Sequence, residues 1–397
     1  MRFSRKILPL VLLTFCSHAF SQNITVIGIG RLGLCMALCL EKAGHNVLGV
    51  DISEEYITQI NSKVFHSFEP KVEEYLKSSK NFTATTSLKE GLEFSDLYFL
   101  VVATNSIPGL ESYDHTLLSK ALTTINSHEV ANKHIIISST VFPGYIDNEA
   151  IKLVKDCPNT DISYNPEFIA QGNIIQGLQN PDMILIGEGS SSAGDILVNL
   201  YQTICENSPY VARMSVASAE ITKLGLNCFI TAKIAFANLI GDIADETPGA
   251  DKNAVLTAIG HDKRVGTACL LPGYGFGGPC FPRDNRALGN YALKKGIQPL
   301  IFSSVDQTNK NHADYMADKL LKMDLDEYVF EDVCYKSKCP VPIIEESQKL
   351  EVAKKLAKNG KEVMIKDREI VLEQVKSEYG NLFSYVNCDT LKGNQDE

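Results

Sequence analysis

NITVIGIGRLGLCMALCLEKAGHNVLGVD, residues 23–51, is the stretch from which the class of fold follows. A β-branched run leads into the glycine pattern Gly28-x-Gly30-x-x-Gly33, which opens a helical pattern, and a second apolar run then ends at Asp51. In a βαβ unit Gly28 permits a tight turn, Gly30 lets backbone approach a pyrophosphate, and Gly33 lets the helix pack closely on the strand. The order strand, glycine turn, helix, strand and acid therefore predicts a dinucleotide-binding unit. The alternative is a structural glycine turn in another α/β unit.

The acid at the end of the second run distinguishes between the two nicotinamide cofactors. Asp51 lies 18 residues after Gly33, where a carboxylate accepts hydrogen bonds from an adenosine ribose and repels a 2′-phosphate. NAD is therefore expected rather than NADP, with its pyrophosphate at the positive N-terminal end of the helix. The expected cofactor contacts in this unit are Gly28, Gly30, Arg31, Leu32, Gly33 and Asp51.

Further apolar runs extend this architecture along the chain. Helical stretches separate the runs LYFLVVAT (97–104), HIIISST (134–140) and MILIGEG (183–189), which read as strands of the same sheet. Strands that alternate with helices favour the α/β class, with an N-terminal doubly wound parallel sheet.

The composition limits the classes of partner. The chain has 397 residues, of which 38 are Lys or Arg and 48 are Asp or Glu, so its formal net charge is −10. Proteins that bind nucleic acid need a basic surface, so no nucleic-acid partner is expected. The eleven cysteines contain no C-x-x-C pair, so no metal site is indicated.

The first 22 residues and the cysteines point to different compartments. A basic start, an apolar stretch over residues 7–15 and small residues at Ala19 and Ser21 resemble a secretory leader over residues 1–22. This apolar stretch is shorter than the ~20 residues of a membrane helix, and no later run is long enough, so no membrane span is expected. Cysteines inside apolar elements favour a reducing compartment. We therefore expect the cytoplasm, with export as the alternative.

Residues 217–246 predict one long, mostly buried helix, because no proline interrupts the pattern before Pro248. Lys223, Asn227 and Thr231 recur every four residues and therefore share one stripe of this helix. A lysine on an apolar helix is costly unless it is paired or useful. The alternative is a lysine whose ammonium group reaches the surface.

The stretch LLPGYGFGGPCFPRDNRALGNYALKKG, residues 270–296, contains a glycine loop that ends at a cysteine. Pro282 suits the first turn of a helix, so Cys280 is expected at a helix N-terminus with Arg283 nearby. The helix N-terminus and the arginine each lower the pKa of a thiol, which predicts a reactive thiolate. A buried structural cysteine is the alternative.

Together these stretches resemble one known family. The motifs SST-x-x-PG (138–144), NPEF (165–168), Lys223-x-x-x-Asn227 and GFGGPCFPRD (275–284) resemble, in this order, those of the UDP-glucose and GDP-mannose dehydrogenases, over about residues 23–311. The cysteine loop is more like the UDP-glucose type. Such enzymes oxidise C6 of a nucleotide sugar to a carboxylate, with two hydrides passing to NAD, through a cysteine thiohemiacetal and thioester. The resemblance implies the conversion of UDP-glucose to UDP-glucuronate.

The resemblance also implies roles for individual residues. Cys280 matches the nucleophile, and Lys223, supported by Asn227, would stabilise oxyanion charge. Asp284 and Thr140 would position or activate water.

Glu167 would serve as acid or base in the hydrolysis, but the second Glu that commonly follows it in this motif is Gln171 here. A glutamine cannot act as a base. Thr104 and Thr140 match cofactor-contacting positions. Arg264 matches an arginine that reaches the sugar nucleotide of a neighbouring subunit, which implies a homodimer. The implied substrate-binding residues are Glu167, Phe168, Lys223, Asn227, Arg264, Tyr274, Gly277 and Lys336.

The C-terminal segment departs from the family. Residues 333–336 resemble the first strand of its second α/β domain, and a helix, a second strand ending at Asp367 and one more helix are expected after them. An unfinished sheet would expose an edge. We expect four regions: a signal-like leader (1–22), an NAD-binding Rossmann-like domain (23–215), a central helix with a dimerisation region (216–312) and a shortened UDP-sugar-binding domain (313–397).

Two alternatives to this activity remain open. A non-catalytic nucleotide-binding relative is suggested by Gln171, the short C-terminal domain and the unusual N-terminus. A β-hydroxyacid dehydrogenase shares an N-terminal NAD domain and a Lys-x-x-x-Asn helix, but it transfers one hydride and needs no thiol. The cysteine in the glycine loop argues against a β-hydroxyacid dehydrogenase.

Overall fold

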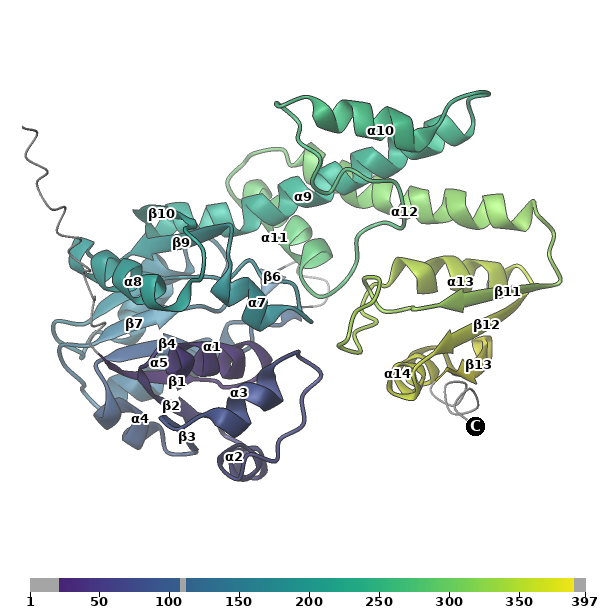
Figure 1. Ribbon diagram of the computed structural model, residues 1–397. Coiled ribbons are helices and arrows are strands. Elements are labelled where there is room, and N and C mark those ends of the chain that lie inside the picture. Colours follow the sequence, from purple (N-terminus) through teal and green to yellow (C-terminus); the bar gives the residue numbers. More distant parts are fainter. Residues whose placement is uncertain (1–20, 108–111, 389–397) are drawn as a thin grey trace, which may run out of the picture.

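A computed structural model describes residues 21–107 and 112–388, so nearly all of the predicted leader lies outside the described residues. Figure 1 shows an N-terminal α/β unit, a helical middle and a smaller C-terminal α/β unit. The N-terminal unit contains an eight-stranded sheet in the order β10-β9-β8-β7-β4-β1-β2-β3. Its strands are β1 (Asn23–Ile27), β2 (Asn46–Val50), β3 (Phe82–Thr85), β4 (Leu97–Leu100), β7 (His134–Ile137), β8 (Asp161–Tyr164), β9 (Met183–Glu188) and β10 (Tyr210–Ser215).

Helices cover both faces of this sheet, as the doubly wound prediction requires. Ile24 and Val26 of β1 pack into one hydrophobic cluster, whereas Ile27 packs into a second cluster. The N-terminal unit also contains a short hairpin of β5 (Ser106–Ile107) and β6 (Ser112–Tyr113). Its helices are α1 (Arg31–Lys42), α2 (Glu54–Asn61), α3 (Val72–Ser78), α4 (Leu88–Phe94), α5 (Thr116–Ser127), the π-helix η1 (Ile146–Ala150), α6 (Ile151–Leu153), α7 (Ile174–Gln179) and α8 (Ser191–Ile204).

One part of the predicted sheet is wrong in direction. The run at 183–189 does join the sheet as β9, but β9 pairs antiparallel with β8, whereas β9 and β10 are parallel to each other. The chain after β8 returns through the short helix α7, which reverses its direction, instead of crossing over the sheet. The other neighbouring strands of the sheet are parallel. From β1 the sheet grows on one side through β2 and β3 and on the other side through β4 and the later strands. Open α/β sheets bind ligands at such a switch point, which here lies between β1 and β4.

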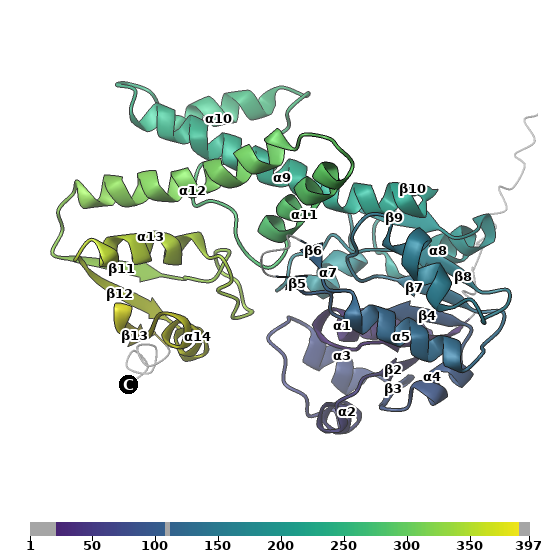
Figure 2. The same cartoon turned by 180° about the vertical axis from the view of Figure 1, so that it is seen from behind.

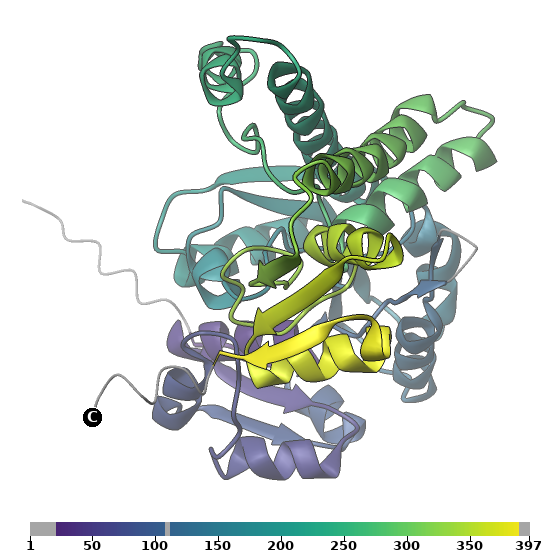
Figure 3. The same ribbon diagram turned by 90° about the vertical axis from the view of Figure 1, so that its right-hand side faces the viewer.

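The helical middle is built on α9 (Val216–Asp245), which confirms the long helix predicted at 217–246. By length and composition alone α9 could cross a membrane, contrary to the expectation from the sequence. It packs instead against α10, α11, α12 and β9, and it buries Glu220 and Lys223, as expected of a core helix. Figure 3 shows α9 and α10 projecting beyond the two α/β units. The other helices here are α10 (Lys252–His261), α11 (Phe281–Lys294) and α12 (Leu300–Leu321).

The C-terminal unit contains a three-stranded parallel sheet in the order β11-β12-β13. The strand expected at 333–336 is wrong: the first strand is β11 (Glu327–Glu331), and residues 332–336 belong to the loop that follows it. The expectation of only two strands is also wrong, since β13 (Ser384–Asn387) follows the last helix. The remaining elements are α13 (Gln348–Lys358), β12 (Glu362–Asp367), α14 (Glu369–Tyr379) and the 3₁₀ helix η2 (Gly380–Leu382).

Candidate functional site

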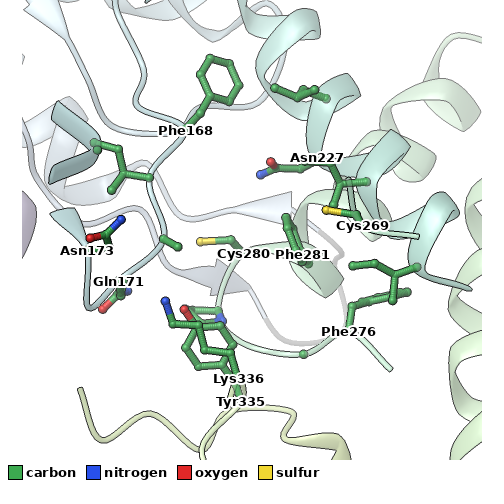
Figure 4. Close-up of a pocket in the computed structure, with 18 of the residues that line it drawn as sticks. Phe168, Gln171, Asn173, Asn227, Cys269, Phe276, Cys280, Phe281, Tyr335 and Lys336 are labelled. Atoms are coloured by element: carbon green, nitrogen blue, oxygen red, sulfur yellow. The ribbon is translucent and has the colours of Figure 1, made fainter. Parts of the chain in front are cut away.

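A cavity of about 1080 Å³ lies where the three parts of the molecule meet. It is large enough for an extended small-molecule ligand, since ligand pockets typically measure ~300–1,000 Å³. Figure 4 shows Cys280 pointing into this cavity, with Phe168 and Lys336 on opposite sides of it. The lining residues come from the segment 167–183 after β8, from α9, from the cysteine loop 269–281 and from the segment 334–349 of the C-terminal unit.

Cys280 is the N-cap residue of α11, with Pro282 in the first turn, as predicted. The thiol is open to the cavity, yet it lies deep among protein atoms. This burial raises the pKa of the Cys280 thiol, and the cations Arg283 and Lys223 only partly oppose it, while Asp284 adds to it. The expected resting thiolate is therefore not what this environment favours. The thiol needs a base, or a change on ligand binding, before it can react.

Asp284 is fully buried beside the cysteine and is held by three donors. The Asn227 amide Nδ2 donates to Oδ2 over 2.7 Å. The Tyr113 hydroxyl donates to Oδ1 over 2.8 Å, and Arg283 Nε donates to the same oxygen over 3.1 Å. These three donors fix the orientation of the carboxyl group. Of these partners, Tyr113 was not foreseen from the sequence.

Lys223 is buried on α9, so the alternative that its ammonium group reaches the surface is wrong. Its Nζ donates to the backbone carbonyl of Glu167 over 2.5 Å and lies 4.6 Å from the centroid of the Phe168 ring. Burial lowers the pKa of Lys223, although Asp284 and Cys280 oppose that change. A lysine of this kind releases its proton more readily than an exposed one.

Glu167 lines the cavity, and its carboxyl group also contacts α8 of the N-terminal unit. The Tyr201 hydroxyl of α8 lies 2.6 Å from Glu167 Oε1 and 2.7 Å from Asn165 Oδ1. Asn165 Nδ2 donates to the Leu185 carbonyl over 2.9 Å, so Asn165 Oδ1 must be an acceptor. Burial raises the pKa of Glu167.

Counting protons in this trio indicates which form of Glu167 is present. The Tyr201 hydroxyl has one hydrogen and cannot donate to two acceptors at once. A protonated Glu167 resolves the conflict by donating to Tyr201, which then donates to Asn165. Geometry and burial therefore both favour the protonated form of Glu167 in the ligand-free chain.

The dinucleotide end has the shape that the glycine pattern predicts. Gly28 has a φ of +89°, and a Cβ atom there would lie 2.8 Å from the Val101 carbonyl oxygen. A Cβ on Gly33 would lie 2.0 Å from the Gly28 carbonyl oxygen, whereas a Cβ on Gly30 would have no other atom within 4 Å. No side chain caps the N-terminus of α1. This open, uncapped end is the kind of place that holds a pyrophosphate.

Other residues expected to contact the cofactor surround this end. Asp51 is half-buried directly after β2, and Leu32 packs against the core of the unit. Thr104 donates to the backbone carbonyl of Thr140 over 2.7 Å, so these two positions lie side by side. Arg31 instead hydrogen-bonds Gln171, the residue that departs from the family motif.

Of the residues expected to bind substrate, most line the cavity and one does not. Tyr274 and Gly277 of the cysteine loop and Lys336 of the C-terminal unit lie on its wall. Lys349 of α13 also lines it, 5.6 Å from the Tyr274 ring, and was not foreseen. Arg264 is exposed and pairs with Asp262 outside the cavity. The described residues contain no cluster of three or more His, Cys, Asp or Glu that could hold a metal ion.

Two domain models of one known family together match most of this chain. The NAD-binding domain of the UDP-glucose/GDP-mannose dehydrogenase family matches residues 22–205, and the central domain of that family matches residues 217–311. The chain belongs to this family. The resemblance based on the motifs is thereby confirmed, and so is NAD as the cofactor.

Relatives of this chain include dehydrogenases of two nucleotide sugars. It is 32% identical to a UDP-glucose 6-dehydrogenase of Rickettsia bellii over 309 residues, which are 77% of this chain and 70% of the relative. It is 30% identical to a GDP-mannose 6-dehydrogenase of Pseudomonas aeruginosa over 369 residues, 89% of this chain and 83% of the relative. A solved UDP-glucose dehydrogenase from Pyrobaculum islandicum superposes with a TM-score of 0.84 at 26% identity, over 98% of this chain and 90% of that one. The family and these relatives support NAD-dependent nucleotide-sugar dehydrogenase activity.

Proposed function

We propose that this dehydrogenase oxidises UDP-glucose at C6 to UDP-glucuronate, in a four-electron reaction through a thiohemiacetal and a thioester on Cys280. The observation that carries the proposal is a thiol at a helix N-terminus, open to a large cavity, beside the buried Lys223 and the Asn227–Asp284 pair. Only an oxidation that passes the aldehyde stage needs a thiol, because the aldehyde must be held and then oxidised again.

NAD, when bound, would supply the hydride acceptor for each oxidation at C6. The open N-terminal end of α1 at Gly30 would bind the pyrophosphate of the cofactor, and Asp51 would bind its ribose. In the first oxidation the C6 hydroxyl must lose a proton. Lys223, whose pKa burial lowers, can accept this proton. As an ammonium group it then stabilises the oxygen that becomes a carbonyl.

In the second oxidation Cys280 adds to the aldehyde. A bond forms between Sγ and C6, the thiol proton passes to a base, and the carbonyl oxygen takes up a proton to give the thiohemiacetal. Loss of the hydride from C6 and of the hydroxyl proton leaves a thioester. Burial raises the pKa of the Cys280 thiol, so we propose that this step uses a neighbouring base, either Asp284 or neutral Lys223.

Water then cleaves the thioester. The oxygen of water bonds to C6, the C6–S bond breaks, and the sulfur leaves as a thiolate that is reprotonated. Asp284, which Asn227 holds one helical turn after Cys280, would orient this water, and Glu167, whose pKa burial raises, would hold a proton at the edge of the cavity. Thr140 lies beside Thr104 on the cofactor side of the site. Phe168, Tyr274, Gly277 and Lys336 are proposed to contact the substrate.

The proposed assembly is a homodimer formed through α9. Large apolar side chains on one side of this helix are exposed, with Phe229 at 64% and Ile243 at 54%. Monomeric proteins rarely expose a continuous apolar patch, and patches of this kind mark interfaces. The stripe consists of Ile221, Phe229, Phe236, Leu239 and Ile243. Arg264, exposed after α10, would reach the cavity of the partner.

The proposed location is the cytoplasm. All ten cysteines of the described residues are free, and several are buried in the core. Chains that keep so many thiols reduced are typical of reducing compartments. Export remains the alternative because of the signal-like residues 1–22, and localising the intact full chain by cell fractionation decides between the two.

The test of the function is the yield of NADH per limiting UDP-glucose with excess NAD. Two NADH per sugar are expected from the full chain, and the activity is expected to vanish in Cys280→Ala. Cys269→Ala is the matched control, because Cys269 lines the same cavity and is exposed. Higher turnover with GDP-mannose or an N-acetylated nucleotide sugar would show that UDP-glucose is the wrong substrate assignment. NAD binding without turnover of any of them would support a non-catalytic relative, and one NADH without dependence on Cys280 would support the β-hydroxyacid type.

A further inference from the structure

The short hairpin of β5 and β6 delivers one side chain to the centre of the proposed active site. Tyr113 is the last residue of β6 and is only 2% exposed. Its hydroxyl donates to Asp284 Oδ1 over 2.8 Å, although the two residues are 171 positions apart in the sequence. Figures 1 and 2 both place this hairpin against α11, the helix that carries Asp284.

The Tyr113 ring also supports the neighbouring cation. The Arg283 guanidinium carbon lies 4.8 Å from the ring centroid, within the range of a cation–π contact. Arg283 Nη1 donates to the Thr104 carbonyl over 3.1 Å, and Arg283 Nε donates to Asp284 Oδ1. Tyr113 therefore contacts both members of the Arg283–Asp284 pair and fixes their relative position.

Counting the acceptor sites of Asp284 shows what this arrangement achieves. A carboxylate oxygen accepts about two hydrogen bonds. Tyr113 and Arg283 occupy both sites of Oδ1, and Asn227 occupies one site of Oδ2. One acceptor site on Oδ2 has no partner among the described residues, and Asp284 is 0% exposed, so this site can serve a ligand or a water molecule only after one enters beside α11. Burial raises the pKa of Tyr113 far above neutrality, so its hydroxyl remains a donor at any working pH.

We propose that Tyr113 is a positioning residue, whose hydroxyl aims the free acceptor site of Asp284 and whose ring holds Arg283 between the Thr104 loop and Cys280. This inference rests on the proposed function, because it assigns to Asp284 the orientation of the water that cleaves the thioester. It couples the cofactor side of the site to α11 through one aromatic side chain.

Removing only the hydroxyl tests the first part of the proposal. Tyr113→Phe keeps the ring under Arg283 but frees Asp284 Oδ1, so thioester hydrolysis slows. We expect kcat to fall about 10- to 100-fold, as for the loss of one hydrogen bond to a charged group. The KM for the sugar nucleotide should fall together with kcat, because an enzyme that accumulates the thioester saturates at lower substrate, so kcat/KM should stay within about two-fold of the wild-type value. Acid-quenched enzyme should contain more Cys280 adduct by mass spectrometry than the wild type contains.

Tyr145→Phe is the matched control. Tyr145 is equally buried, contacts His115 beside Tyr113, and loses a hydrogen bond to Ser119 when its hydroxyl is removed. It does not contact Asp284, so its kcat and its adduct should match those of the wild type. Equal kcat in wild type, Tyr113→Phe and Tyr145→Phe would overturn the inference. An inactive wild type would instead refute the proposed function.

Alkylation of Cys280 tests the second part without any turnover. The charged groups around this thiol are Lys223 from α9, Arg283 and Asp284 from α11, and Glu345 from the C-terminal unit. Tyr113→Ala removes the ring and lets Arg283 move away, which weakens its stabilisation of the thiolate. Iodoacetamide should then modify the Cys280 peptide several-fold more slowly at neutral pH, whereas Tyr113→Phe should keep the wild-type rate. An unchanged rate in Tyr113→Ala, with NAD binding intact, contradicts the role of the ring.

Discussion

Glu167 and Tyr201 make a prediction about stability that does not depend on catalysis. Burial raises the pKa of Glu167 in the folded chain, so the folded state binds its proton more tightly than the unfolded state does. Stability from this group is therefore full below pH ~4.5 and is lost as the pH rises through the folded pKa. Each pKa unit of this difference corresponds to about 1.4 kcal/mol.

Replacing Glu167 by Gln removes this titration while it keeps a neutral side chain of the same shape. We expect the free energy of unfolding of Glu167→Gln minus that of the wild type to increase as the pH rises above ~4.5. Denaturant unfolding at several pH values measures this difference. Glu188→Gln is a suitable comparison, because Glu188 lies near the surface in an ion pair with Arg213. A difference that stays constant between pH 4 and pH 8 would show that Glu167 is ionised in the folded chain.

Single residues also show how far the sequence can predict this site. Cys280, Lys223 and Asn227 were found because their motifs are local and their helices are strongly patterned. Tyr113 and Tyr201 were not found, because each reaches its partner across the fold from an element with no motif of its own. The expected lowering of the Cys280 pKa is opposed in the structure for a related reason. A helix N-terminus and a nearby cation can be read from the sequence, but the burial that outweighs them cannot.

At the scale of elements, the glycine turn between β1 and α1 separates packing from cofactor binding. A methyl group on Gly33 would lie 2.0 Å from the Gly28 carbonyl oxygen, so Gly33→Ala must push α1 away from β1. We expect a loss of about 1–3 kcal/mol from such overpacking, which lowers Tm by several degrees. Gly30→Ala meets no other atom within 4 Å, and its φ of −61° suits alanine.

Gly30→Ala should therefore keep the wild-type Tm but lose NAD affinity, because its methyl group occupies the space of the pyrophosphate. Differential scanning calorimetry and an NAD titration of both variants give the two readouts. Equal loss of Tm in the two variants would contradict the packing argument. Unchanged NAD affinity in Gly30→Ala would place the pyrophosphate elsewhere.

Elements also differ in how well the sequence predicts them. The run at 183–189 correctly predicts a strand, but a pattern of apolar residues contains no information on its direction in the sheet. In the C-terminal unit, the apolar residues Val333 and Cys334 are buried although they lie in a loop. A buried loop segment of this kind cannot be told from a strand by its hydrophobicity. The true first strand, β11, alternates buried and exposed positions between two terminal glutamates, a weaker signal.

At the scale of the whole molecule, the cavity and the apolar stripe of α9 belong to different sides of the same helix. Lys223 and Asn227 face the cavity, whereas Ile221, Phe229 and the other side chains of the stripe are exposed on the opposite side of the helix. Dimerisation through the stripe would cover this apolar surface and place α10, with the loop that carries Arg264, close to the partner. The proposed site is then complete only when two chains meet.

Mixing two inactive variants tests this shared site. Arg264→Ala and Cys280→Ala should each be nearly inactive as homodimers, the first because the partner's cavity lacks its guanidinium group and the second because it lacks the thiol. After the two chains are mixed, unfolded and refolded together, half of the dimers are mixed, and one of their two sites contains both residues. The pool should recover about a quarter of the wild-type activity per site. Adding Phe229→Glu to both chains should abolish the recovery, since a charge on the apolar stripe prevents association. No recovery from mixed dimers that are detected by native mass spectrometry would mean that Arg264 serves its own chain or neither.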